Sequence, residues 1–313
     1  MLILARVGTH PMTTREKEAG ADGATPLEDP EAPLAVPALA EAEQKRVEER
    51  VAPRAAVVYE TIRREGEDEL TRPLAALAWS GIAAGLSMGF SMVAEGLLRS
   101  HLPDAEWRPL VVKLGYSVGF LIVVLGRQQL FTENTLTAIL PLLARKNLST
   151  LGRVASLWAV VLATNLIGAL VFAWVAGNTS VFGPDMQRAF TEIGRDALAV
   201  GAGNAVLRGI FAGWLIALMV WLMPTADGAR VQIIIIITYV VGLAGFTHII
   251  AGSIEVLYMV MTGAADWGTA LGGYILPTLL GNILGGVSLV AVLNYAQVIA
   301  GSARANDQPG KQA

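Results

Sequence analysis

Gly245-Phe246-Thr247-His248 interrupts an apolar run that extends from Val231 to about Thr262. A second polar stretch, Gly126-Arg127-Gln128-Gln129, interrupts an earlier run that extends from Leu110 to Leu143. Unwound backbone at membrane depth survives only where it is buried in protein or lines a cavity. The two interruptions therefore predict broken helices around a transport site.

Charged residues are distributed unevenly along the 313 residues, of which 54% are hydrophobic and 16% charged. Of the 49 Asp, Glu, Lys and Arg residues, 25 precede Pro73 and three follow Ala300, which leaves 21 within residues 73–300. This excludes a soluble globule with a polar tail and indicates a multi-span membrane protein. We expect a cytoplasmic extension over residues 1–72, a channel domain over residues 73–300 and a tail over residues 301–313.

Six apolar segments of the channel domain satisfy the length of about 20 residues that a bilayer core demands. They are roughly Leu74–Leu98, Leu110–Leu143 with its interruption, Thr150–Ala176, Asn204–Met223, Val231–Thr262 with its interruption, and Leu271–Ile299. The broken segments are the second and the fifth, which are corresponding positions in two halves of three spans. Since three is odd, the second half should be inverted. The predicted fold is all-α, with six transmembrane helices in two inverted three-helix repeats.

The N-terminal extension has its own pattern. Residues 15–40 should be disordered, and Glu41–Arg50 and Arg54–Leu70 should be helical. In the second helix, an apolar stripe of Val57, Val58 and Ile62 leaves two interpretations open: a solvated helix, or one that rests on the membrane or over a pore mouth. The stretch Met12-Thr13-Thr14-Arg15-Glu16 predicts an alternative start of translation at Met12.

Several classes of function are excluded by what the sequence contains. There are no cysteines, so disulfides and thiolate chemistry are excluded, and we expect no metal or cofactor. The net charge of −3 argues against nucleic acid as a partner. Basic residues such as Arg145, Lys146 and Arg230 modestly favour cytoplasmic N- and C-termini.

His248 is the single histidine inside an apolar run, and an ionisable group there indicates a functional site. Its alternative interpretation is a core histidine bonded to a carbonyl. Glu255 lies two helical turns later, where it could pair with His248 through water, face a cavity or bind an arginine.

The first interruption continues as Leu130-Phe131-Thr132-Glu133-Asn134-Thr135. Thr132 and Asn134 suit the capping of a restarted helix, and Glu133 suits the positive end of its dipole. Arg127 would be costly unpaired in a membrane, and Glu133 or Glu255 is its expected partner. Asn282, in the sixth span, could line a pore or hold a broken helix in place.

Four ordered motifs resemble those of the formate/nitrite transporter family. The second span resembles the family's Glu-Leu-Phe-Thr-Gly-Asn block, and the fourth span its Arg-Gly-Ile…Asn-Trp-Leu…Trp motif. The other two motifs resemble Gly-Phe-Glu-His and Gly-Asn-Ile-Ile-Gly-Gly. In this chain they read Gln129–Asn134, Arg208–Trp221, Gly245–His248 and Gly281–Gly286, and the resemblance covers about residues 73–300.

The resemblance implies an aquaporin-like protomer with one pore, assembled as a homopentamer in a bacterial cytoplasmic membrane. The family passes small monovalent anions or their acids, such as formate, nitrite, hydrosulfide, lactate and acetate. Carried over by motif, the site comprises a central histidine, a loop slit, two apolar constrictions and a supporting amide. The central histidine would be His248, and the loop slit would be formed by Leu130, Phe131 and Thr132. The apolar constrictions would lie at Phe120 and Val241, and the supporting amide would be Asn282.

This chain also departs from the family pattern around the expected pore. Thr247 and Gln129 stand where the family has glutamate, and Gly213 and Gly252 stand where it commonly has asparagine. Glu133 replaces a glycine, and Arg127 and Glu255 are additional charges. These departures indicate a divergent subgroup, whose substrate the resemblance does not specify.

A bare anion is strongly penalised in a narrow apolar pore, whereas a neutral acid is not. We therefore expect a weak-acid anion to enter a positive vestibule and approach His248. It should then cross as the neutral acid, with a proton supplied by or through His248. The alternatives are a channel for a small neutral solute and a non-conducting scaffold or receptor. A membrane enzyme is disfavoured because the sequence has no nucleophile or metal motif of a known class.

Overall fold

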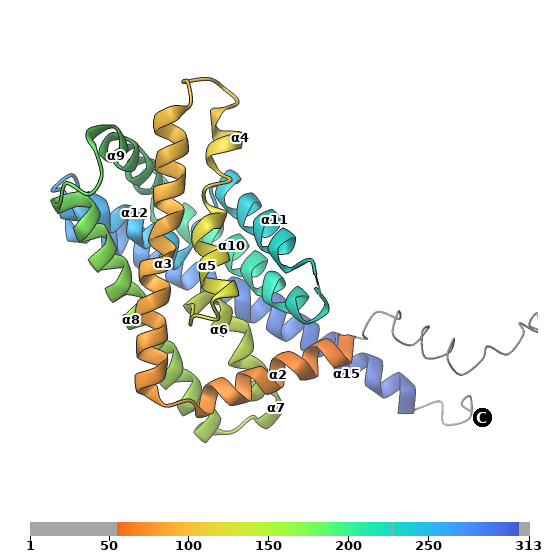
Figure 1. The fold of residues 1–313 in the computed structure, drawn as a ribbon. Helices are drawn as coiled ribbons and strands as arrows, with labels where there is room; N and C mark the ends of the chain where they lie inside the picture. Colours follow the sequence, from red (N-terminus) through yellow and green to blue (C-terminus); the bar gives the residue numbers. More distant parts are fainter. Residues whose placement is uncertain (1–54, 227, 307–313) are drawn as a thin grey trace, which may run out of the picture. The chain divides into compact units, whose positions relative to one another are not determined.

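The computed structural model describes residues 55–306 except residue 227, and every regular element in this part of the chain is a helix (Figure 1). The all-α fold class predicted from the sequence is therefore confirmed. The predictions for residues 1–54, including the disordered segment and the helix Glu41–Arg50, lie outside the described residues.

Five described segments are long and apolar enough to cross a membrane. They are α3 (Leu74–His101), α4 to α5 (Arg108–Leu125), α8 (Leu148–Asn178), α10 with η1 (Ala202–Thr225), and the segment Trp267–Ala300. Two shorter apolar helices, α11 (Arg230–Leu243) and α12 (Ile249–Met261), occupy the predicted fifth span. The predicted spans thus match helices to within a few residues, and a count of six spans and their inversion remain predictions.

Both predicted interruptions are breaks between helices. The first break, residues 126–130, separates α5 (Ser117–Leu125) from α6 (Phe131–Thr137), which is followed by α7 (Ile139–Arg145). The second break, residues 244–248, separates α11 from α12. The apolar pattern predicts that the second span resumes over Leu136–Leu143, whereas in the structure the helix after the first break begins at Phe131.

The two breaks have the same backbone conformation. Each includes a residue in the left-handed region, Arg127 with φ 50° in the first and Gly245 with φ 64° in the second. Each ends on an extended residue that precedes the new helix, Leu130 (φ −106°, ψ 127°) and His248 (φ −114°, ψ 130°). Leu130 and His248 therefore occupy corresponding positions of the two breaks.

The long helices approach closely through glycine. A Cβ atom on Gly85 of α3 would lie 2.2 Å from the backbone oxygen of Asn165 in α8. A Cβ atom on Gly213 of α10 would lie 2.2 Å from the backbone oxygen of Asn282 in α14 (Leu276–Leu284). Any side chain at Gly213 would therefore require these helices to move apart.

The last span is not a uniform α-helix. It comprises α13 (Trp267–Ala270), the π-helical η2 (Leu271–Ile275), α14, the π-helical η3 (Gly285–Val292) and α15 (Leu293–Asn306). Short π-helical segments occur frequently at functional sites, because they displace side chains from the ordinary helical register.

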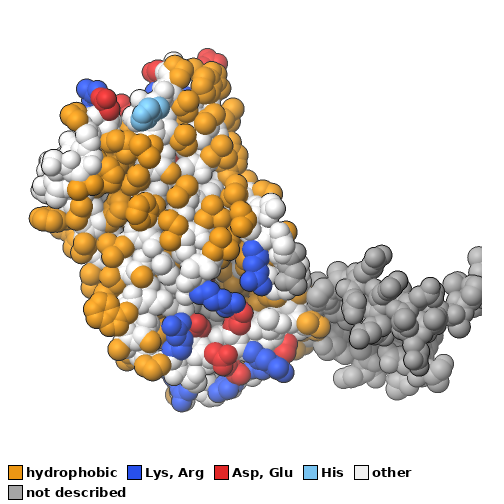
Figure 2. All heavy atoms as spheres, in the orientation of Figure 1, with side chains coloured by type: hydrophobic (Ala, Val, Ile, Leu, Met, Phe, Trp, Pro, Cys, Tyr) orange, Lys and Arg blue, Asp and Glu red, His pale blue; other side chains and the backbone are white. Residues whose placement is uncertain are grey.

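Two amphipathic helices, α2 and α9, lie at spatially opposite ends of the described part of the protein (Figure 1). At one end, α2 (Ala55–Thr71) packs against α6, α7 and α15 and buries Val58 and Ile62, whereas Val57 is exposed. At the other end, α9 (Pro184–Leu198) packs against α3 and α12. Figure 2 shows charged side chains gathered at the α2 end of the visible face, below an expanse of hydrophobic ones.

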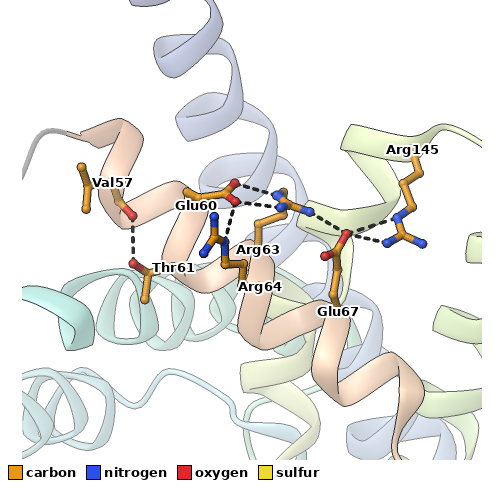
Figure 3. A network of polar contacts seen from close by, with 7 residues as sticks. All are labelled: Val57, Glu60, Thr61, Arg63, Arg64, Glu67 and Arg145. Atoms are coloured by element: carbon orange, nitrogen blue, oxygen red, sulfur yellow. Dashed lines mark hydrogen bonds and ion pairs between the residues drawn. The ribbon is translucent and has the colours of Figure 1, made fainter.

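An ion-pair network holds α2 to α7 (Figure 3). Arg63 bonds to both Glu60 and Glu67, and Arg145 of α7 reaches the same Glu67 carboxylate at 2.8 Å. A Cβ atom on Gly66 would lie 1.9 Å from the backbone oxygen of Thr137, so α2 also sits tightly on α6. These contacts show that α2 packs on α6 and α7, and the predicted placement of this helix on the membrane or over a pore mouth stays a prediction.

Acid is expected to loosen α2. Hydrogen bonds from Arg63 and Arg64 lower the pKa of Glu60 from 4.5 to about 2. The folded state is thus stabilised by the ionised carboxylate above pH 4.5, and this contribution is lost as the pH falls toward 2. Since Glu60 is partly exposed, amide exchange in α2, corrected for intrinsic rates, should accelerate at most about five-fold between pH 6 and pH 3.

The glutamine variant Glu60→Gln should exchange at the faster rate at both pH values, because its side chain does not titrate. Glu106→Gln, at an exposed position beyond α3, is the matched control and should behave as the unmodified protein does. Identical pH responses in Glu60→Gln and the unmodified protein would contradict this role of Glu60.

Candidate functional site

The two breaks meet at a hydrogen bond between Thr132 and His248. Thr132 Oγ1 lies 2.9 Å from His248 Nε2, and both side chains are buried. His248 Nδ1 accepts hydrogen bonds from the backbone N–H groups of Ile250 and Ala251 at 3.3 and 3.2 Å, so the imidazole caps α12. Because Nδ1 accepts, the neutral ring carries its proton on Nε2 and donates it to Thr132.

Apolar and aromatic side chains surround this polar pair. The ring centroid of Phe120 lies 5.0 Å from that of His248 with an interplanar angle of 75°, and Tyr116 packs on Phe120 at 5.3 Å. Leu130 and Val241 are fully buried, and Phe131 packs edge-on against Trp158 at 5.7 Å. An ion at His248 would therefore be poorly solvated.

Asn165 of α8 holds the first break in place. Its Oδ1 accepts from Phe131 N at 2.9 Å, and its Nδ2 donates to the backbone oxygens of Gly81 and Gln129, both at 2.8 Å. One buried amide thus satisfies three backbone groups of the unwound segment and its neighbour.

Asn282 of α14 makes the same set of contacts at the second break. Its Oδ1 accepts from Ile249 N at 2.9 Å, and its Nδ2 donates to the backbone oxygens of Gly209 and Thr247, both at 2.9 Å. The sequence singled out Asn282 but not Asn165. Asn165 could have been found as an isolated amide in the third span of its half, where Asn282 stands in the other half.

Two cavities lie on either side of the Thr132–His248 pair. The α2-side cavity has a volume of about 310 Å³ and is lined by Glu65, Asp68, Glu69, Arg127, Glu133 and Arg230, with neighbouring apolar residues. The α9-side cavity has a volume of about 220 Å³ and is lined by Lys113, Tyr116, Thr247, Gly252, Glu255 and Tyr274, among others. Cavities on both sides of a buried polar pair are the arrangement that a pore requires.

The predicted site residues separate into three groups. Arg127 and Glu133 line the α2-side cavity, and Thr247 and Glu255 line the α9-side cavity. The others are buried at the breaks or in the helices that pack on them: Phe120, Leu130, Phe131, Thr132, Val241, His248 and Asn282. Thr247 donates from Oγ1 to the backbone oxygen of Ala205 at 2.7 Å.

The expected capping of α6 by side chains is wrong. Leu130 is the N-cap residue and makes no side-chain capping bond, because the Thr132 hydroxyl is engaged with His248 and Asn134 Nδ2 donates to Gln129 Oε1 at 3.0 Å. Glu133 does lie in the first turn of α6, as its charge predicts.

The expected ion pair of Arg127 is also wrong. Among the described residues, Arg127 forms no ion pair with Glu133, and Glu255 lines the opposite cavity. The physical reason is that Arg127 is exposed toward the α2-side cavity, where water can solvate it, so burial does not force it to pair. One oxygen of Glu133, in contrast, is buried without a hydrogen-bond partner.

A buried ion pair near the α9-side cavity was not foreseen. Glu95 of α3 is 1% exposed, and its Oε2 lies 2.5 Å from Lys113 Nζ. A lone glutamate in the first apolar span was the available signal, because a buried carboxylate requires a partner. No cluster of three or more potential metal-binding side chains occurs within the described part of the chain.

The chain matches the formate/nitrite transporter family over residues 56–296. The inner membrane protein YfdC of Escherichia coli (strain K12) is 42% identical over 251 residues, which cover 80% of this chain and 81% of that protein. The formate channel BtFdhC of Bacillus thuringiensis is 27% identical, over 76% of this chain and 93% of that channel. A solved pentameric formate channel with formate bound is 21% identical and matches 72% of this chain and 98% of its own, with a TM-score of 0.61.

A helical membrane protein with these similarities is a transport protein rather than an enzyme. This chain belongs to the formate/nitrite transporter family.

Proposed function

We propose that this protein is a channel for a small monovalent weak acid of the formate or nitrite class, with proton linkage at His248. The observation that carries the proposal is the Thr132–His248 pair, which lies between two cavities and among apolar side chains. Its membrane would be the bacterial cytoplasmic membrane, with both termini cytoplasmic. The similarity to a pentameric formate channel supports a homopentamer.

The mechanism follows from the cost of an ion in an apolar constriction. An anion that leaves either cavity loses its hydration, and His248 Nε2–H is the donor placed to bind its oxygen in place of Thr132. Protonation of the anion removes its charge, so the neutral acid can pass Phe120 and Leu130. The apolar surroundings of buried His248 favour its neutral ring, so the proton is supplied through His248 rather than stored on it.

The α2-side cavity favours a neutral form of the cargo. Three carboxylates of α2, Glu65, Asp68 and Glu69, line it together with two arginines, Arg127 and Arg230, and Glu133 is a fourth, buried carboxyl group. This cavity therefore differs from the positive vestibule that the sequence predicts. A bare anion is repelled by this excess of negative charge, whereas a neutral acid is not. The same observation supports a second candidate function, a channel for a small neutral solute.

Flux through the purified protein in liposomes tests the proposal. Formate, nitrite, acetate and a neutral solute such as glycerol should be compared by stopped-flow light scattering, with internal pH followed by a trapped dye. We expect formate or nitrite entry at rates well above empty liposomes, accompanied by a pH change. Glycerol entry alone would favour the second candidate, and no entry of any solute would favour a non-conducting scaffold.

A further inference from the structure

A buried pair of hydroxyl groups joins the two half-helices that lead into the breaks. The hydroxyl oxygens of Thr238 in α11 and Ser117 in α5 lie 2.8 Å apart, and the two residues are 0% and 2% exposed. Thr238 Oγ1 also lies 2.6 Å from the backbone oxygen of Ile234, and Ser117 Oγ lies 3.4 Å from that of Ile235. Since a hydroxyl donates one hydrogen bond and accepts others, these contacts are compatible with one another. Ser117 is thus bonded to α11 rather than to its own helix.

The opposite side of α5 is fixed to α3. Ser91 Oγ of α3 donates to the backbone oxygen of Tyr116 at 2.6 Å and accepts from Gly119 N at 3.0 Å. Ser91 is 2% exposed, so water does not compete for these bonds. α5 therefore has a fixed position on α3, and the separation of α5 from α11 depends on α11.

Two further contacts join α11 to the second span. A Cβ atom on Gly242 would lie 2.9 Å from Cγ of the Tyr116 ring, so these residues already touch. The Tyr239 hydroxyl donates to the backbone oxygen of Leu110 at 2.8 Å, in α4 and at an exposed position. Helices in a bilayer are held together by close packing and by interhelical hydrogen bonds. The Ser117–Thr238 pair is the buried hydrogen bond of this kind between α5 and α11.

The two half-helices run in opposite directions past this bond. The chain of α5 leads from Tyr116 at the α9-side cavity to Leu125 at the α2-side cavity. The chain of α11 leads from Arg230 at the α2-side cavity to Leu243 at the α9-side cavity. The bond therefore marks a crossing point. Residues that follow it lie nearer the α2-side cavity on α5 and nearer the α9-side cavity on α11.

Both apolar constrictions predicted from the sequence lie one helical turn from this crossing. Phe120 follows Ser117 by three residues on α5, so the two share one face of the helix. Val241 follows Thr238 by three residues on α11 in the same way. Both apolar side chains are fully buried, and the Phe120 ring centroid lies 5.0 Å from that of His248. The separation of α5 and α11 at the crossing therefore affects the space beside both side chains.

We propose that the Ser117–Thr238 hydrogen bond sets the width of the pore at Phe120 and Val241 and so limits the size of the cargo. Without the bond, α11 moves away from α5, which Ser91 keeps on α3. A one-carbon acid gains little from the wider path, whereas an acid with additional carbon atoms is then admitted. This inference rests on the proposed function and identifies two positioning residues that determine its size limit.

Thr238→Val is the direct test, because valine is close to threonine in shape and lacks the hydroxyl. Fluxes of formate and of the larger lactate are measured in liposomes, after subtraction of the flux into empty liposomes. Formate flux should stay within about two-fold. The ratio of lactate to formate flux should rise at least about three-fold, the factor that corresponds to one interhelical hydrogen bond in a membrane protein.

Three further variants separate the bond from a general effect on folding. Ser117→Ala should raise the flux ratio by the same factor as Thr238→Val, and the double variant should raise it no further, because the two residues form one bond. Thr238→Ser keeps the hydroxyl and should keep the ratio of the unmodified protein. Ser253→Ala is the matched control: Ser253 is also fully buried, but its hydroxyl donates to the backbone oxygen of Ile249 within its own helix, α12.

The inference is overturned, with the proposed function left intact, if Thr238→Val and Ser117→Ala leave the flux ratio unchanged or lower it. Equal losses of formate and lactate flux in these variants would also overturn it, as would an equal rise of the ratio in Ser253→Ala. If the unmodified protein carries neither acid, the proposed function fails first and the inference fails with it.

Discussion

Replacing His248 with asparagine is expected to reduce formate or nitrite flux by at least about ten-fold and to flatten its dependence on pH. The loss follows because the donor at Nε2 and the titratable ring are both removed, and a hydrogen bond to a charged group contributes about 1.5–3 kcal/mol. Asparagine is a favourable N-cap residue, so it can replace the bonds of His248 Nδ1 to Ile250 N and Ala251 N. The variant should therefore fold.

Alanine at position 248 distinguishes the helix-capping role of the imidazole from its role in transport. His248→Ala should lose flux as the asparagine variant does and also lose about 1 kcal/mol of stability with the cap. His101→Asn, at the exposed end of α3, is the matched control and should leave flux and pH dependence unchanged. Unchanged flux and unchanged pH dependence in both His248 variants would exclude a transport role for the imidazole.

Replacing Asn165 or Asn282 with leucine is expected to prevent accumulation of a folded protein. Each amide satisfies one backbone N–H and two backbone oxygens. A buried group left without a partner costs about 1–3 kcal/mol, so three such groups approach the typical total stability of about 5–15 kcal/mol. The yield of monodisperse protein in mild detergent and its unfolding temperature are the measurements.

Asn178→Leu is the corresponding control, because Asn178 is an exposed amide at the end of α8. It should purify with normal yield. If Asn165→Leu and Asn282→Leu both kept the yield and unfolding temperature of the unmodified protein, the amides would not be the groups that hold the breaks.

The positions of the breaks were predictable from the sequence because a membrane makes interrupted hydrophobicity conspicuous. Gly245–His248 and the polar stretch at Arg127 both fall where the helices end. The start of α6 at Phe131 was not predictable in the same way, since Phe131, Thr132 and Leu136 suit either a loop or a helix. The hydrogen bond from Phe131 N to Asn165 Oδ1, a contact between two spans, fixes where α6 begins.

Local rules failed where a side chain has a distant partner. Threonine is a common helix-capping residue, yet the Thr132 hydroxyl bonds to His248, which is 116 positions away in the sequence. Glu95 is one residue in an apolar span, and only the fold brings Lys113 to it. The π-helical turns that place Tyr274 over Gly252 likewise depend on packing between spans, which hydrophobic periodicity does not encode.

The positions of the two asparagines set an order for membrane insertion during translation. Asn165 lies on α8 and Asn282 on α14, and each follows in the sequence the break that it holds. The first break can close as soon as α8 has entered the bilayer, because both partners have then been synthesised. The break at His248 has to wait, with unpaired backbone groups, until α14 leaves the ribosome. A nascent chain that ends before residue 282 therefore contains the central histidine but cannot complete the loop that positions it.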